Sequence, residues 1–277
     1  MTFRDLHTLE HYSSVVDLQR RIWGAEYADI VPAAIFAIVV KRGGILVGAF
    51  DEQDRMGAFV FSLPGLKHGR VMQWSHMLGV DEPFRRSGLG YRLKLAQRDR
   101  TLAQGLDLIE WTYDPLQAAN AHLNFARLGV VAEEYLENVY GESDSILHRG
   151  TPTDRFVASW YVASPHVERR VAATPSTVPV RAASLANVPV VNPTRQEGEW
   201  LVCDGDPDTR HREPRLFVEI PVGFTAMQAD APEHASRWRL VTRDVFLSYF
   251  ANGYRCVDFL LDVEQGRGRY LLQRADD

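Results

Sequence analysis

The residues best suited to chemistry lie in one stretch, Leu78 to Tyr91, in which two arginines precede two glycines. Its centre, Arg85-Arg86-Ser87-Gly88-Leu89-Gly90, stands between a segment with strand character and a segment with helical periodicity. A strand-to-helix turn leaves the first helical amides unpaired, and glycines let an anion come close to the backbone. With the helix dipole and two guanidinium groups, this stretch suits a pyrophosphate.

The pattern Arg-x-x-Gly-x-Gly alone does not distinguish such a site from a glycine-rich turn that opens an ordinary helix. Two familiar phosphate motifs are excluded by spacing. A nucleotide P-loop requires Gly-Lys-Ser or Gly-Lys-Thr, and neither tripeptide occurs in the sequence. A dinucleotide fingerprint requires a third glycine, where this chain has Leu93 and Lys94.

Apolar periodicity and turn residues predict the elements that must position this stretch. Helices are expected over 10–23, from Pro32 to 43, over 88–104, from Asp114-Pro115 to 129, and over 233–252. Strands are expected over 45–50, 56–63, 71–80, 106–113, 130–136, 156–162, 215–221, 254–263 and 269–272. The order strand-helix-strand-strand occurs twice, which permits a degenerate internal duplication.

A length of 277 residues favours two domains. We expect a first domain over 1–162 and a C-terminal α+β unit over 210–277. The proline-rich stretch 163–209 between them is expected to be a linker or an irregular crossing.

The composition excludes several classes of protein. A hydrophobic content of 45% and a charged content of 24% are those of a globular protein. The net charge of −5 argues against nucleic acid or an anionic membrane as the main partner. Two cysteines make neither a disulfide framework nor a Cys-only zinc site, and we expect no metal. With no secretory signal or membrane span in the sequence, the cytoplasm is the expected compartment, and 28 arginines against 3 lysines suggest a bacterial source.

Two blocks of sequence resemble the GNAT superfamily of acyl-CoA-dependent N-acyltransferases. Leu78-x-Val80, then Phe84, then Arg85-x-x-Gly88-x-Gly90 is similar to the family's pyrophosphate motif. The block Ala121-His122-Leu123-Asn124-Phe125-Ala126-Arg127-Leu128-Gly129 resembles its later helix. The resemblance extends roughly from residue 3 to residue 162, and the remaining residues lie outside it.

The resemblance implies a mixed α/β (α+β) fold, with a mostly antiparallel sheet between flanking helices, and a smaller C-terminal unit. Two central strands would separate at Leu78 to Val80, where a main-chain amide would polarise the thioester carbonyl. The co-substrate would be acetyl-CoA or another acyl-CoA. The residues expected to bind it are Leu78, Gly79, Val80, Arg85, Arg86, Ser87, Gly88, Leu89, Gly90, Tyr91, Asn120 and Asn124, the last two on one helix face that could equally be a solvated one.

An amine acceptor must lose a proton before it attacks a thioester, and histidine is the side chain best suited to take it. His76 stands two residues before Leu78, so on a regular strand both side chains would share one face. A core histidine bonded to a carbonyl is an equally good reading. Glu110, on the neighbouring strand, is the second candidate base, and its alternative is a carboxylate that faces solvent.

The superfamily often places a tyrosine, as proton donor to the leaving thiolate, where this chain has Phe125. Tyr113, Tyr135 and Tyr140 are candidate substitutes, with Tyr140 taken as the catalytic candidate, and packing is the alternative for each. A mechanism without an acid also remains open, because a thiol pKa of about 8.5 makes a thiolate a tolerable leaving group.

Trp23, Tyr27 and Trp74 are the candidate acceptor-binding residues, or else core aromatics. We expect an N-acyltransferase that moves an acyl group to a small-molecule amine, such as an amino acid, by direct transfer. The alternatives are a non-catalytic acyl-CoA-binding or regulatory module and a protein N-acetyltransferase. The C-terminal unit would extend the sheet, shape the acceptor pocket or mediate a homodimer.

Overall fold

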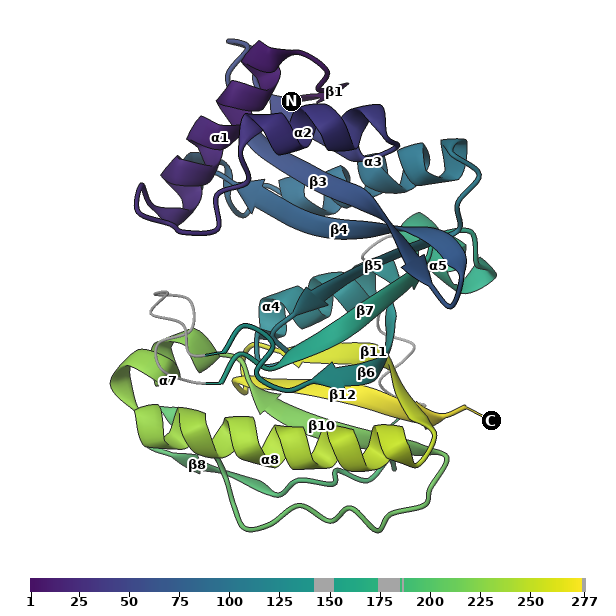
Figure 1. Ribbon diagram of the computed structural model, residues 1–277. Helices are drawn as coiled ribbons and strands as arrows, with labels where there is room; N and C mark the ends of the chain where they lie inside the picture. The colour runs from purple at the N-terminus through teal and green to yellow at the C-terminus, as the bar shows by residue number, and fades with distance from the viewer. Residues whose placement is uncertain (142–151, 174–184, 186, 276–277) are drawn as a thin grey trace. The chain divides into compact units, whose positions relative to one another are not determined.

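The computed structural model describes residues 1–141, 152–173, 185 and 187–275. The chain forms two compact units. Unit 1 comprises residues 1–111 and 161–164, and unit 2 comprises 112–160 and 165–277. Each unit combines a largely antiparallel set of strands with flanking helices, which confirms the predicted mixed α+β class (Figure 1).

Unit 1 contains five strands that pair in chain order. Each neighbouring pair from β1 to β4 is antiparallel, whereas β4 and β5 run parallel. The strands are β1 (Thr2–Asp5), β2 (Ile45–Phe50), β3 (Met56–Lys67), β4 (Arg70–Val80) and β5 (Leu108–Tyr113), the last two residues of β5 belonging to unit 2. The predicted hairpin of β2 and β3 is present, and β3 runs on past residue 63.

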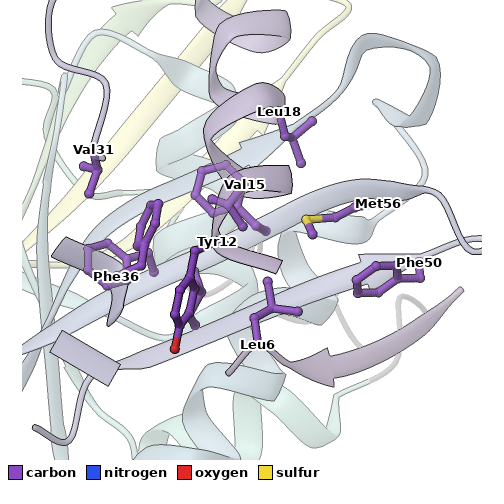
Figure 2. Packing of buried hydrophobic residues seen from close by; sticks show 11 residues of the cluster. Leu6, Tyr12, Val15, Leu18, Val31, Phe36, Phe50 and Met56 are labelled. Atoms are coloured by element: carbon purple, nitrogen blue, oxygen red, sulfur yellow. The ribbon is translucent and has the colours of Figure 1, made fainter. Parts of the chain in front are cut away.

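Helices cover both faces of these strands. The helices α1 (Leu9–Trp23) and α2 (Ala33–Lys41) lie on one face, called here the α1–α2 face, and α3 (Leu89–Ala103) lies on the other, the α3 face. Figure 2 shows the apolar core under α1 and α2, in which Val15, Leu18 and Phe36 pack on strand residues such as Phe50. A short 3-10 turn, Glu82–Phe84, connects β4 to α3.

Local signals explain where these helices begin and end. The hydroxyl of Thr8 accepts a hydrogen bond from the His11 amide at 3.3 Å and so caps the start of α1. At the end of α1, the amide of Gly24 donates to the Arg20 carbonyl, with a φ of 103° that favours glycine. α3 ends at the predicted place, just before Gly105.

Unit 2 contains a second set of paired strands, in the order β7-β6-β11-β12-β10, and a separate ribbon of β8 and β9. The strands are β6 (Val131–Leu136), β7 (Arg155–Tyr161), β8 (Thr194–Glu197), β9 (Trp200–Cys203), β10 (Arg215–Pro221), β11 (Tyr254–Asp262) and β12 (Arg267–Arg274). The helices are α4 (Ala118–Ala121), a π-helix (His122–Leu128), α5 (Pro165–Ala172), α7 (Phe224–Asp230) and α8 (Pro232–Ala251).

Two antiparallel strand pairs of unit 2, β6 with β7 and β11 with β12, meet where β6 neighbours β11. Along the chain, β6 and β7 follow α4, and β11 and β12 follow α8. Ala132 of β6 pairs with Cys256 of β11 in an antiparallel register. This arrangement is that expected of a duplicated strand-helix-strand-strand motif, although the duplication itself stays a prediction.

The segment 163–209 has more regular structure than expected of a linker. Pro165 begins α5, and β8 and β9 pair from Thr194 to Cys203. Proline is compatible with the first turn of a helix because its missing N–H would have no partner there. The predicted domain boundaries after residues 162 and 209 stay a prediction.

Candidate active site

The central feature of unit 1 is a strand with a half that has only one neighbour. β4 pairs with β3 along its length, from Arg70 to Val80. With β5 it pairs only at Gln73 and Trp74, whose partners are Ile109 and Glu110. From Ser75 to Val80, therefore, the second edge of β4 has no strand partner within unit 1, and its backbone groups are available to a ligand. The unpaired part of β4 thus begins at Ser75, three residues before Leu78. The two strands were expected to separate at Leu78 to Val80.

A β-bulge interrupts β4 at His76. Met77 pairs with Phe61 and Ser75 pairs with Ser62, so His76 is an extra residue without an opposite partner on β3. Leu78 packs in the cluster beneath α3, whereas the His76 ring lies edge-on to Phe61, which belongs to the cluster beneath α1 and α2. The expectation that His76 and Leu78 share a face is therefore wrong, because the bulge shifts the alternation by one residue.

His76 lies on the α1–α2 face with its side chain exposed. The centres of the His76 and Phe61 rings are 6.1 Å apart. Partial burial lowers the pKa of His76 below its ordinary 6.5, and the nearby Asp29 carboxylate opposes this by favouring the imidazolium. Asp29 belongs to the loop between α1 and α2. The imidazole is thus mainly neutral at neutral pH and can accept a proton.

The predicted acceptor-binding aromatics Trp23 and Tyr27 lie at the end of α1 and in the loop that follows it. Their ring centres are 5.7 Å apart, and Trp23 also packs edge-on against Phe59 at 6.1 Å. A Cβ placed on Gly79 would come within 3.1 Å of the Trp23 ring, so glycine is required for this close approach of helix to strand. Both rings are partly exposed on the same face as His76.

Trp74 and Glu110 are paired neighbours on β4 and β5. Strand alternation places Trp74 on the face opposite to Ser75, hence on the α1–α2 face. Glu110 is only 4% exposed, and its Oε1 lies 2.5 Å from Nζ of Lys67. The carboxylate therefore does not face solvent. Its ion pair favours a structural role, and His76 is the better candidate base.

The loop from Arg85 to Tyr91 has the backbone of an anion site. Arg86 and Gly88 adopt φ values of 62° and 76°. From Arg86 to Gly90, no main-chain N–H donates to a carbonyl of the described residues, and the first such bond of α3 runs from Arg92 to Gly88. A Cβ on Gly88 would meet no atom within 4 Å, so the space beside it is open to a ligand. Leu89, in contrast, is buried and anchors the helix.

The charges around this loop are predominantly positive. The side chains of Arg85 and Arg86 are exposed, and Arg85 Nε donates to the Val80 carbonyl at 3.3 Å. The carboxylate of Asp81 is paired with Arg21 at 3.1 Å. Ser87 turns its hydroxyl back to the Phe84 carbonyl, so the main chain of Ser87 is its better donor to an anion.

Asn120 and Asn124 do not share a solvated face. Asn120 is exposed, whereas Asn124 is 4% exposed. Asn120 lies in α4, whereas Asn124 lies in the π-helix, which packs against β11 and α5. The helix also begins at Ala118 and not at Pro115, because the Asp114 carboxylate bonds the Leu116 amide at 3.0 Å in a turn. Gly129 ends it as predicted, at a φ of 75°.

The tyrosine candidates all belong to unit 2. Tyr140 is 56% exposed, and its hydroxyl lies 3.2 Å from Thr112 Oγ1. Tyr135 and Tyr113 are buried, the first donating to Asp154 at 2.7 Å and the second lying 3.1 Å from the Tyr270 hydroxyl. Burial raises the pKa of Tyr113 well above 10. Of the three, only Tyr140 is open to solvent.

Sequence reasoning missed one polar cluster on the α3 face. Lys94, Gln97 and Thr101 are buried on α3, and Lys94 and Gln97 bond Ser75 of β4. The signal was available: polar residues spaced three and four apart next to the apolar Leu89, Leu93 and Ala96 indicate a second buried stripe on the helix. Among the described residues, no three His, Cys, Asp or Glu side chains are grouped so that they could hold a metal.

Solved structures of GNAT-family acetyltransferases resemble this chain. An aminoglycoside 6'-acetyltransferase type Ii matches with 20% identity and a TM-score of 0.46, over 59% of this chain and 99% of its own. A GNAT-family acetyltransferase from Streptococcus pneumoniae matches with 16% identity and a TM-score of 0.47, over 57% and 97%. An aminoglycoside 6'-N-acetyltransferase complexed with coenzyme A matches with 17% identity and a TM-score of 0.43, over 59% and 98%.

The structural neighbours are thus acetyltransferases of the superfamily that the two sequence blocks resemble. No family model and no curated protein matches the chain. No helix of the described residues is both long and apolar enough to cross a membrane.

Proposed function

We propose that this protein is an acyl-CoA-dependent N-acyltransferase that acts on a small-molecule amine by direct transfer. The observation that carries the proposal is the arrangement of β4. Its unpaired half ends at a loop of free amides suited to a pyrophosphate, and its bulge presents a proton acceptor, His76, on the opposite face from α3. The phosphate site and the base thus lie at opposite ends of the unpaired edge of β4. The phosphate site suits CoA, and the base suits an amine that attacks the thioester.

The loop would hold the pyrophosphate through the main-chain amides of Arg86 to Gly90, with Arg85 and Arg86 adding charge. The free edge of β4 from Ser75 to Val80 would pair with the amide groups of the pantetheine arm. An N–H on this edge would stabilise the oxyanion that develops on the thioester carbonyl, a contribution of about 3 to 4 kcal/mol in acyl transfer elsewhere.

His76 would remove the proton from the attacking amine. Its lowered pKa keeps the imidazole neutral at neutral pH, and its position near Asp29 places it beside the α1–α2 loop. Trp23 and Tyr27, partly exposed on the same face, would contact the acceptor. The nitrogen lone pair forms the C–N bond as the C–S bond breaks, and CoA leaves as the thiolate.

A non-catalytic acyl-CoA-binding module is the second candidate, because Phe125 occupies the position of the expected acid and is fully buried between Tyr113 and Tyr270. A protein acceptor is a further possibility for the same chemistry.

A thiol-release assay with acyl-CoAs and small amines, combined with calorimetric binding of CoA, tests the proposal. Turnover that depends on His76 supports the transferase. CoA binding without turnover on any amine or peptide would leave only the binding module. A protein that binds no CoA would exclude both.

A further inference from the structure

The cluster of Ser75, Lys94, Gln97 and Trp111 places a buried amine at the point where β4 and β5 separate. Nζ of Lys94 lies 2.8 Å from Ser75 Oγ and 3.2 Å from Gln97 Oε1. It also lies 3.6 Å from the centre of the Trp111 ring, a cation–π distance. All four side chains belong to unit 1 and are between 0% and 7% exposed.

No carboxylate of the described residues forms an ion pair with Lys94. Its contacts are a hydroxyl, an amide oxygen and a ring, none of which carries a negative charge. Burying an ammonium group without a counter-charge costs several kcal/mol, on the order of the penalty for any buried ion. A leucine or methionine would fill the same space at lower cost, so packing does not explain a lysine here.

The cluster around Lys94 and the phosphate loop lie at opposite ends of the unpaired edge of β4. Ser75 directly follows Trp74, the last residue of β4 that pairs with β5, and Trp111 directly follows Glu110, the partner of Trp74. The loop of free amides lies beyond the opposite end of the unpaired edge, after Val80. Val80 lies five positions after Ser75 on the strand, or roughly 17 Å away. A ligand with its pyrophosphate on the loop would therefore place its far end near Ser75.

We propose that Lys94, with Ser75 and Gln97, forms a subsite for an acyl group that ends in a carboxylate, such as a dicarboxylic acyl-CoA thioester. This inference rests on the proposed use of acyl-CoA. The ligand's carboxylate would supply the negative charge that the protein does not provide. The Gln97 amide, of which one N–H donates to Ser75, would offer it a further hydrogen bond.

The choice of lysine fits such a subsite. Burial lowers the pKa of Lys94 well below its ordinary 10.5. Burial thus disfavours the charged form of this amine in the empty site, and a ligand carboxylate would favour it again. An arginine could not do this, since it stays charged at any physiological pH. This chain uses 28 arginines and only 3 lysines, yet lysine occupies this position.

Calorimetric titration of the full-length protein with succinyl-CoA, butyryl-CoA and CoA tests the inference. Succinyl-CoA and butyryl-CoA have the same number of acyl carbons, so only the carboxylate differs. We expect wild type to bind succinyl-CoA at least about tenfold more tightly than butyryl-CoA, with proton uptake visible in buffers of different ionisation enthalpy. Equal affinity for the two thioesters would overturn the inference.

Two variants localise the effect. In Lys94→Met the preference for succinyl-CoA should vanish while affinity for CoA remains. Gln97→Glu keeps the lysine but gives it an internal carboxylate, and it should abolish the preference as well. Unchanged melting temperatures would establish that both variants are folded, and a preference that persists in both would place the carboxylate elsewhere. If the wild-type protein binds neither CoA nor the two thioesters, the result would instead contradict the proposed function itself.

Discussion

His76 and Met77 are consecutive residues of β4 with side chains on the same face of the sheet. Met77 packs against the apolar cluster beneath α1 and α2, and His76 contacts Phe61 of that cluster. The bulge at His76 produces this arrangement, because it adds a residue to β4 that has no partner on β3. As a result, the candidate base lies on the face of Trp23, at the end of α1, and of Tyr27, in the loop that follows, and not on the face covered by α3.

Replacement of His76 by alanine is expected to lower kcat by about 10²- to 10⁴-fold, the usual contribution of a general base. CoA affinity should stay unchanged, because the imidazole lies on the α1–α2 face. Steady-state kinetics and calorimetry of the same preparation measure the two effects. His7→Ala, which changes an exposed histidine of the same unit, is the matched control. A rate unaltered by His76→Ala would remove this residue from the mechanism.

The pH profile should follow the ionisation of His76. Because burial lowers its pKa below 6.5, kcat/KM is expected to rise with pH through a value below 6.5 and to reach a plateau by neutrality. The Asp29 carboxylate favours the imidazolium, so Asp29→Asn should shift the acid limb to still lower pH. NMR titration of His76 reports the same shift directly. A limb that stays in place or moves upward would contradict the assigned environment.

Gly88→Ala is expected to weaken CoA binding by about tenfold or more, which corresponds to about 1.4 kcal/mol. The new methyl group would enter the open space where the ligand is proposed to lie, and a left-handed alanine adds about 1 kcal/mol of backbone strain. Gly69→Ala is the control, because Gly69 has a similar φ of 79° and equally open surroundings in the β3–β4 turn. Both variants should lose similar stability, and only Gly88→Ala should lose affinity.

Phe125→Tyr should not create the missing proton donor. Phe125 is fully buried, with its ring centre 5.6 Å from that of Tyr270 and 6.4 Å from that of Tyr113. A hydroxyl added to this core is expected to destabilise the protein by about 1 to 3 kcal/mol through overpacking and desolvation. Thermal unfolding and kcat measure the outcome. An increase in kcat would show that position 125 reaches the reacting groups after all.

Glu110→Gln should act on stability and leave the pH profile in place. The substitution removes the carboxylate charge that pairs with the Lys67 ammonium. Breaking a buried pair costs up to about 3 to 5 kcal/mol, and less here because Lys67 is 21% exposed. The double variant Lys67→Met, Glu110→Gln should recover part of the loss in urea unfolding. If the acid limb of kcat/KM disappears in Glu110→Gln, the base is Glu110 and not His76.

Local patterns predicted most elements of the first part of the chain. Gly24, Gly105 and Gly129 end their helices at the expected places. The expected turn residues connect β2 to β3 in the hairpin. The loop before α3 could be predicted for the same reason, since a strand, an arginine pair and two glycines are all local in sequence.

Side-chain orientation was less predictable where it depends on distant pairing. The bulge at His76 follows from the register between β3 and β4, which single-strand alternation does not encode. Asn120 is exposed and Asn124 is buried, because the π-helix that holds Asn124 packs against β11 and α5, which are distant in sequence. The spacing of Lys94, Gln97 and Thr101 on α3 indicates a buried polar stripe, but not the partners of Lys94, because Ser75 and Trp111 belong to two other elements.

The pairing of β6 with β11 has a consequence for the edge that β6 would otherwise expose. An uncovered strand edge is a template for association with another chain, and proteins protect such edges from aggregation. In this chain the C-terminal strands occupy that edge, with Cys256 opposite Ala132. The same edge is thus closed to a second copy. A fragment that ends before residue 210 should expose the edge of β6 that β11 neighbours, and it is expected to aggregate more readily than the full chain.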